Sequence, residues 1–164
     1  MYRCPPCGRR PWDGHQVQRS DSENTRLRAR LWPVLYVVPP LVWAGVIFWL
    51  SSVPSSGYAG TSHYFDWLPW YSYFIHGGLY FVLGGLTVRL LYRVKVRFPW
   101  LTAAQLAVLI VTLYGLSDEY HQTFVAGRDF SLLDLTADFL GASCAAAAWA
   151  VWSRAWSGWR ARRA

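Results

Sequence analysis

The side chains that could carry out chemistry are concentrated in residues 117–138, which hold five of the chain's nine acidic groups. The candidate catalytic residues are Asp118, Glu119, His121, Asp134 and Asp138. The candidate ligand-binding residues are Arg128, Gln122 and Ser131 from the same stretch, with His76 and Tyr80 from an earlier part of the chain. Carboxylates beside an imidazole and one arginine can exchange protons, hold a cation or bind an anionic group.

Keeping all the carboxylates of this stretch ionised would cost free energy in a site that is partly shielded from water. Asp134 and Asp138 are four residues apart, which places them ~6 Å apart along one helix face. Asp118 and Glu119 are expected to share the site. Either some of the four take up protons, or a cation compensates them. The candidates for that cation are Arg128, protonated His121 or His76, and a divalent metal ion.

A metal ion would take its ligands from Asp118, His121, Asp134 and Asp138, a set that suits Zn²⁺, Mn²⁺ or Mg²⁺. Arg128 has the planar shape that binds a phosphate or carboxylate through two hydrogen bonds. A structural alternative stays open, in which Asp134 caps a helix and Asp138 pairs with Arg128 to hold a loop.

His76 and Tyr80 belong to an apolar segment. An ionisable residue inside such a segment marks a functional candidate, and Tyr80 follows His76 by one helical turn, so both can lie on one face. The structural alternative for His76 is a hydrogen bond to a backbone carbonyl or to another helix.

These residues are expected to be positioned by apolar helices, which appear in the sequence as segments without charged side chains. Three windows of about 20 residues carry no charged side chain, namely 31–50, 67–88 and 98–117. Each is long enough to cross a ~30 Å hydrocarbon core as a helix. A fourth window, 139–153, is too short at ~22 Å, and spans only if its helix starts near Leu132 and carries Asp134 and Asp138 in its outer turns. The sequence therefore predicts an all-α, four-span transmembrane helical bundle.

The basic residues predict how the spans are oriented. Fifteen of the 16 Lys and Arg residues lie within residues 1–30, 89–97 and 154–164, and the remaining one is Arg128. Because cytoplasmic segments carry an excess of basic residues, we expect a multi-pass protein of the cell membrane with both termini cytoplasmic. The inner positive charge then attracts anionic lipid, and its place beside the spans argues against nucleic acid as a partner.

Three regions follow from this organisation. Residues 1–30 form a polar, Arg-rich tail that composition predicts to be disordered. Residues 31–153 form the four-helix membrane domain, and residues 154–164 a basic cytoplasmic tail. Cys4 and Cys7 make a C-x-x-C pair in the first tail, without the further ligands of a zinc site, so we assign them no role. Cys144 is predicted to be a small buried packing residue.

Helical periodicity orients the site residues. If the third span continues outward past Leu116, Asp118 shares one face with His121 and Gln122, while Glu119 points elsewhere. Ser131 suits the N-cap of the last span, with Asp134 at the third helical position.

The last span carries a stripe of small residues. Gly141, Ala142 and Ala145 continue the helical face of Asp134 and Asp138. Small residues let another helix approach closely, so we expect this face, and the two aspartates with it, to point into the bundle. Such Gly and Ala faces also permit a homo-oligomer.

A family resemblance rests on these residues. The segment 114–124 (YGLSDEYHQTF), followed by Gly127-Arg128, Ser131, Asp134, Asp138 and Gly141, resembles the signature of the VanZ-like membrane proteins. Ser51-Ser52, His76, Tyr80 and Arg89 resemble the first half of that family, so the likeness covers residues 33–152. It departs from the family pattern at Ala126 and at Ser72-Tyr73, where Pro and Asp-Lys are common. The resemblance implies a small polytopic protein of the bacterial envelope, in a family whose namesake is associated with resistance to the glycopeptide teicoplanin.

Three functions compete for this pattern. The first is a membrane enzyme that acts on an envelope lipid or a lipid-linked cell-wall precursor. The second is a non-catalytic accessory protein that binds such a ligand, since the chain shows no recognised nucleophile and no complete metal motif. The third is a small proton-coupled transporter, because acids inside a membrane can relay protons. Four spans with all their acids at one end favour the first two.

Overall fold

The computed structural model describes residues 31–58, 70–94 and 102–163. Its α-helices are α2 (Val38–Ser51), α4 (Tyr71–Val94), α5 (Ala103–Gln122) and α6 (Leu132–Ala161), and a short 3₁₀ helix, η1 (Ser55–Tyr58), follows α2. Within these residues no strand occurs, which confirms the all-α class. The predicted disorder of residues 1–30, and Cys4 and Cys7 with it, lies outside the described residues.

Three helical segments are long and apolar enough to cross a membrane, namely Leu31–Ser51, Tyr71–Val94 and Leu132–Ala161. The first combines α2 with the helical residues 31–36 that precede it. Helix α5 is not among the three, because its last two turns carry Asp118, Glu119 and other polar groups. It nevertheless exposes Leu109, Ile110 and Leu113, as the other helices expose their own apolar residues. The fourth span therefore stays a prediction.

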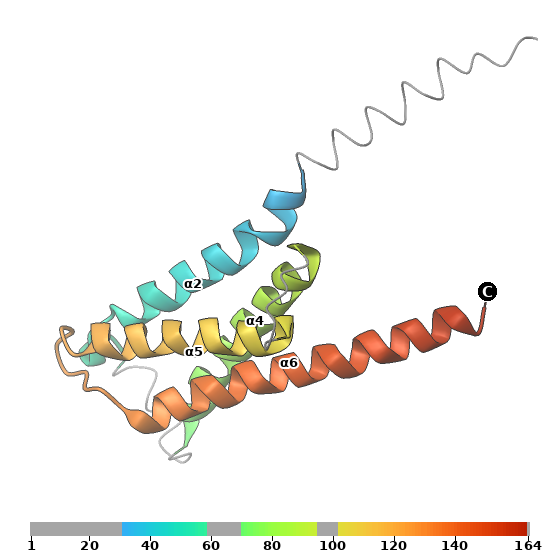
Figure 1. The fold of residues 1–164 in the computed structure, drawn as a ribbon. Coiled ribbons are helices and arrows are strands. Elements are labelled where there is room, and N and C mark those ends of the chain that lie inside the picture. Colours follow the sequence, from blue (N-terminus) through green and yellow to red (C-terminus); the bar gives the residue numbers. More distant parts are fainter. Residues whose placement is uncertain (1–30, 59–69, 95–101, 164) are drawn as a thin grey trace, which may run out of the picture.

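The helices run up and down, so that the bundle has two distinct ends (Figure 1). At one end Ser51 of α2 meets Asp118 of α5, and His76 of α4 meets Asp138 of α6. At the other end Arg89 stacks on Tyr36. We call these the acidic end and the basic end. The separation of charge expected from the sequence is thus reproduced by the packing, without reference to which side of a membrane each end faces.

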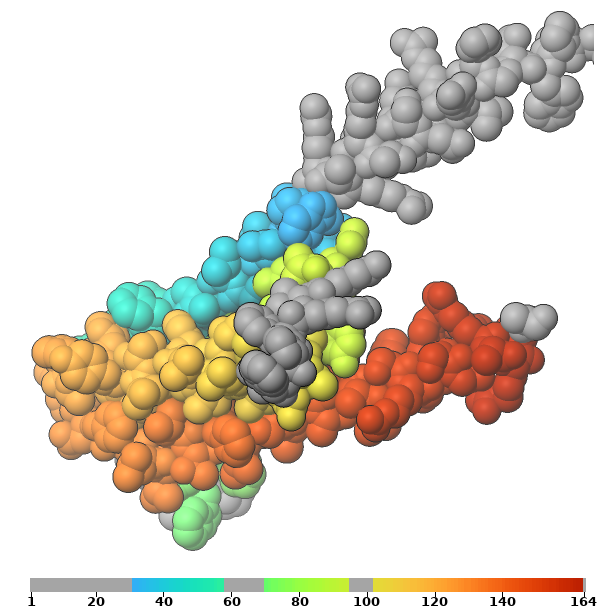
Figure 2. Space-filling model, in the orientation of Figure 1, coloured from blue at the N-terminus to red at the C-terminus, as the bar shows by residue number. Residues whose placement is uncertain are grey.

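Helix α6 is longer than the predicted fourth span. It continues to Ala161, and its 30 residues correspond to ~45 Å of helix. Its C-terminal turns stand clear of the other helices in Figure 2 and expose Trp152, Trp156 and Trp159. Arg160 and Arg163 stack on two of these indole rings, which is typical of residues at a membrane surface.

Close packing of α4 on α6 forms the centre of the fold, and α5 covers both helices. A Cβ atom at Gly141 would collide with the backbone carbonyl of Gly77, and one at Gly84 would lie 2.9 Å from the Cα of Ala142. The stripe of small residues on α6 therefore faces the bundle, as predicted, and lets the two backbones approach.

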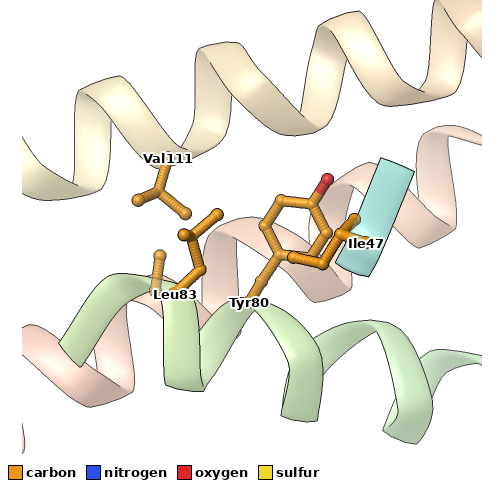
Figure 3. Close-up of a cluster of buried hydrophobic side chains, with 5 residues drawn as sticks. Ile47, Tyr80, Leu83 and Val111 are labelled. Carbon is orange, nitrogen blue, oxygen red and sulfur yellow. The ribbon is translucent and has the colours of Figure 1, made fainter. Parts of the chain in front are cut away.

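The apolar core lies beside this contact. One cluster joins α2, α4, α5 and α6 through Ile47, Tyr80, Leu83, Val111 and Ala142 (Figure 3). A second cluster, nearer the basic end, contains Val88, Leu91, Ala107 and Ala146. The prediction for Cys144 was wrong, because this side chain is exposed. It lies on the outward face of α6. It follows the buried Ala142 by two residues and precedes the buried Ala145 by one, which rotates it by about 200° and about 100° around the helix from these two side chains.

We expect Gly141→Ala to destabilise the protein by about 1–3 kcal/mol, because the added methyl group has to force α4 and α6 apart. Gly78→Ala is the matched control, since a Cβ atom there meets nothing within 4 Å, and alanine is the better helix former. Unfolding of the detergent-solubilised protein, followed by circular dichroism, measures both. Equal stability of the two variants would contradict the close packing.

Candidate functional site

The acidic end brings together polar side chains from three helices. His76 comes from the second turn of α4, Glu119 from the last turns of α5, and Asp134 and Asp138 from the first two turns of α6. Asp134 is half-buried, whereas Glu119 and Asp138 are completely buried. We call these four residues the His–acid cluster.

Asp138 and His76 form the central pair of the cluster. Asp138 Oδ1 lies 3.1 Å from His76 Nδ1. An ionised carboxylate can only accept, so Nδ1 is then the donor and Nε2 is left to bind a proton or a ligand. The other oxygen, Oδ2, is buried and has no hydrogen-bond partner among the described residues. It lies 3.0 Å from the point that a Cβ atom of Gly115 would occupy, so this glycine of α5 provides the space for it.

Glu119 connects α5 to the start of α6. Its Oε2 accepts the backbone N–H of Ser131 at 2.8 Å, and its Oε1 accepts the side-chain amide of Gln122 at 3.4 Å. Oε1 also lies 4.0 Å from His76 Nδ1. Ser131 is the N-cap of α6, as predicted, and its hydroxyl accepts the backbone N–H of Asp134. The Glu119 carboxylate therefore sits at the positive end of the α6 dipole. Burial is the larger influence and raises the pKa of Glu119, and the hydrogen bond from the Ser131 backbone N–H opposes that rise in part.

Asp118 and His121 face a different neighbour, the C-terminal end of α2. Asp118 Oδ2 accepts the Ser51 hydroxyl at 2.7 Å, and Gln122 donates to the same oxygen at 3.3 Å. His121 Nε2 lies 3.1 Å from the Ser52 hydroxyl. The shared face of Asp118, His121 and Gln122 is as predicted, and so is the separate direction of Glu119.

His121 also stacks on Phe48 of α2, with 4.5 Å between the ring centroids. Sequence reasoning did not place Ser51 and Ser52 in the site. The feature that could have indicated them is a pair of hydroxyl side chains at the polar end of an apolar span.

One group of side chains has the spacing of a metal site. A ring nitrogen of His76 and one carboxylate oxygen each from Glu119 and Asp134 lie within 4.8 Å of one another. The sequence proposed Asp118, His121, Asp134 and Asp138 as ligands. The structure turns Asp118 and His121 toward α2 instead, and of the proposed set Asp134 belongs to the group.

Tyr80 was a ligand-binding candidate, and the structure places it in the core. Its ring is completely buried, and in Figure 3 it lies between Leu83 and Ile47. Its hydroxyl has no hydrogen-bond partner within the described ranges. By contrast, the hydroxyl of Tyr114 donates to the backbone carbonyl of Ala44 at 2.7 Å, which ties α5 to α2.

Arg128 lies in the loop between α5 and α6, half-buried. Gly127 before it has a positive φ of 73°, a conformation that L side chains rarely adopt. The Ser55 side chain occupies the place of a Cβ atom at Gly127, and the Ser55 backbone N–H donates to Ala126 at 3.3 Å. The loop backbone just before Arg128 is thus held against η1.

Taken together, apolar helices of membrane-spanning length and a buried polar cluster at one end define a small helical membrane protein. The family model described as VanZ/LLP1 matches residues 35–153, and the chain belongs to this family. The resemblance seen in the motif around residues 114–141 is therefore confirmed. Comparison with curated proteins and with solved structures gives no match.

The His76–Asp138 pair predicts energetic coupling between α4 and α6. His76→Ala leaves a buried carboxylate without its donor and should destabilise the protein by about 1–3 kcal/mol. In the double variant His76→Ala/Asp138→Asn, the loss should be smaller than the sum of the single losses by roughly 0.5–3 kcal/mol. Denaturant unfolding in detergent measures all three.

His121→Ala combined with Asp138→Asn is the control for this cycle. His121 contacts Ser52 and Phe48 rather than Asp138, so these two losses should add. Additive losses for His76 and Asp138 as well would show that the pair is not an interacting unit.

Proposed function

We propose that this protein binds, and acts on, the polar head group of an envelope lipid or lipid-linked cell-wall precursor at the outer face of a bacterial membrane. The observation that carries the proposal is the convergence of His76, Glu119, Asp134 and Asp138 from three helices at the acidic end. Ionisable groups buried at such a position are costly, and they mark functional sites in membrane proteins.

The surroundings of the cluster support a ligand that lies in the membrane surface. Trp70, Tyr120, Phe124 and Phe130 are exposed large aromatic residues at the acidic end. Aromatic residues concentrate where the hydrocarbon core meets water. A lipid whose tail stays in the bilayer would therefore present its head group at the depth of the cluster.

The chemistry of the site fits a head group that carries both phosphate and hydroxyl or amine groups. Arg128 supplies the planar guanidinium that pairs with phosphate oxygens. Carboxylates at the edge of the cluster, such as Asp134, accept hydrogen bonds from hydroxyl or ammonium groups. Because the namesake of the VanZ-like family is associated with teicoplanin resistance, we include such a role in the proposal; a protein that alters a cell-wall precursor or access to it would fulfil it.

Native mass spectrometry of the full-length protein in detergent tests the ligand class. The probes are a polyprenyl diphosphate and the matching polyprenol. We expect saturable binding of the diphosphate, weakened about ten-fold by Arg128→Ala, because a ten-fold loss corresponds to about 1.4 kcal/mol and one lost charged contact supplies that. Release of inorganic phosphate in the same samples separates an enzyme from a binding protein.

The control for this measurement is Arg154→Ala, an exposed arginine on the distant part of α6. Its binding should equal that of the wild-type protein. Equal binding of polyprenol and diphosphate, or an unchanged affinity in Arg128→Ala, would contradict the proposal.

We further propose that the acidic end faces outward and that the C-terminal end of α6 is cytoplasmic. In a background with all three cysteines replaced by serine, Asp129→Cys and Ser157→Cys introduce exposed single thiols at opposite ends. A membrane-impermeant maleimide should label Asp129→Cys in intact spheroplasts and Ser157→Cys after lysis alone, because basic segments stay inside. The reverse labelling pattern would overturn this topology.

A further inference from the structure

We propose that His76, Glu119 and Asp134 bind a divalent transition-metal ion, Zn²⁺ or Mn²⁺, which in turn takes the anionic group of the ligand. The first half stands on the geometry of the cluster, and the second half rests on the proposed function. The three ligand atoms come from α4, α5 and α6 and lie within 4.8 Å of one another.

The donor set points to a transition metal. One imidazole nitrogen with two carboxylate oxygens is a mixed set that Zn²⁺ and Mn²⁺ accept readily, whereas Ca²⁺ and Mg²⁺ prefer oxygen alone. Three protein ligands leave coordination positions open, which is the arrangement of a site that takes a substrate or water rather than of a structural site.

Asp138 supplies the support that a metal-binding histidine needs. A histidine that ligates a metal almost always gives its other ring N–H to a carboxylate, which fixes the tautomer and the ring orientation. Asp138 Oδ1 lies 3.1 Å from His76 Nδ1 and can accept that proton. This arrangement requires Nε2 to take the metal, since Nδ1, which also lies 4.0 Å from Glu119 Oε1, is then occupied by Asp138. Asp138 is completely buried, so the packing of α4 on α6 fixes its carboxylate beside the His76 ring.

The unsatisfied atoms of the cluster indicate missing positive charge. Asp134 Oδ1 and Asp138 Oδ2 are buried and have no hydrogen-bond partner in the part of the chain that the structure describes. Glu119 is also completely buried beside them. Uncompensated carboxylates are costly in such surroundings. Glu119 has donors for both oxygens, so the unsatisfied atoms are those of the two aspartates, and a divalent ion bound by Glu119 and Asp134 would place positive charge beside them.

A bound cation would also explain how a site rich in acidic residues can bind an anionic head group. Without it, the carboxylates of the cluster repel phosphate oxygens. With it, the open coordination positions attract them.

Isothermal titration calorimetry of the tag-free, full-length protein with Zn²⁺ and with Mn²⁺ alone tests the site. Cys4 and Cys7 are replaced by serine in every sample, so that these two thiols cannot add a separate zinc-binding event to the titration. We expect one ion per chain, with binding lost in Asp134→Asn and in Glu119→Gln. Asp138→Asn should weaken the affinity 10–100-fold through the orientation of His76.

Asp129→Asn is the matched control. This aspartate is exposed in the α5–α6 loop, five residues before Asp134, and it is not one of the three proposed metal ligands. It should bind as the wild-type protein does. Size-exclusion chromatography checks folding, and Asp134→Asn is the decisive variant because Asp134 is half-buried and its backbone N–H, not its carboxylate, completes the Ser131 cap.

Two outcomes would overturn the inference. One is the absence of saturable binding of either ion to the wild-type protein. The other is binding that Asp134→Asn and Glu119→Gln leave unchanged. Because these titrations contain no lipid, the result is independent of head-group binding. Metal binding without diphosphate binding would refute the proposed function alone. Diphosphate binding that persists unchanged in chelator-treated Asp134→Asn would refute the second half of the inference, that the ion takes the anionic group, and would leave the proposed function standing.

Discussion

The close approach of α4 and α6 is the constraint on which the rest of the structure depends. Gly141 lies directly against the backbone carbonyl of Gly77, and Gly84 lies against Ala142. His76 immediately precedes Gly77, and Asp138 precedes Gly141 by three residues. The same contact that joins the two backbones therefore places Nδ1 and Oδ1 3.1 Å apart. In a membrane, where the solvent is as apolar as the side chains, such small-residue contacts and interhelical hydrogen bonds are what hold helices together.

Helix α5 completes the arrangement by leaving room for Asp138 and by carrying two further acids, whose donors lie on α2 and at the start of α6. Gly115 leaves space for Asp138 Oδ2 and for the ring of Tyr80. One turn later, Glu119 accepts the backbone N–H of Ser131, and Asp118 accepts the Ser51 hydroxyl. Each buried acid thus has at least one oxygen bonded to a specific donor, and Glu119 has both, which is how buried polar groups are tolerated. One oxygen each of Asp118, Asp134 and Asp138 has no hydrogen-bond partner among the residues that the structure describes, and the proposed cation would lie beside them.

The sequence indicated which residues share a helix face more reliably than it indicated which other helix each face contacts. Asp118, His121 and Gln122 do share a face, and Glu119 does point away from it. Which helix each face meets depends on the rotation of α5 about its axis, and helical periodicity carries no information on that angle. Asp118 and His121 were therefore grouped with the aspartates of α6, whereas they contact α2. Cys144 was misplaced for the same reason, since it lies next to the small-residue stripe but on the outer side of α6.

The sequence by itself determined the helices, the N-cap at Ser131, the inward stripe of α6 and the separation of acidic from basic ends, because charge-free length, periodicity and capping are local properties. The tertiary structure alone decided that His76 pairs with Asp138, 62 residues away, and that Glu119 and Asp134 complete the cluster. Those contacts join side chains from separate helices. They depend on how closely and at what rotation the helices pack, which the glycines at positions 77, 115 and 141 permit and the folded bundle sets.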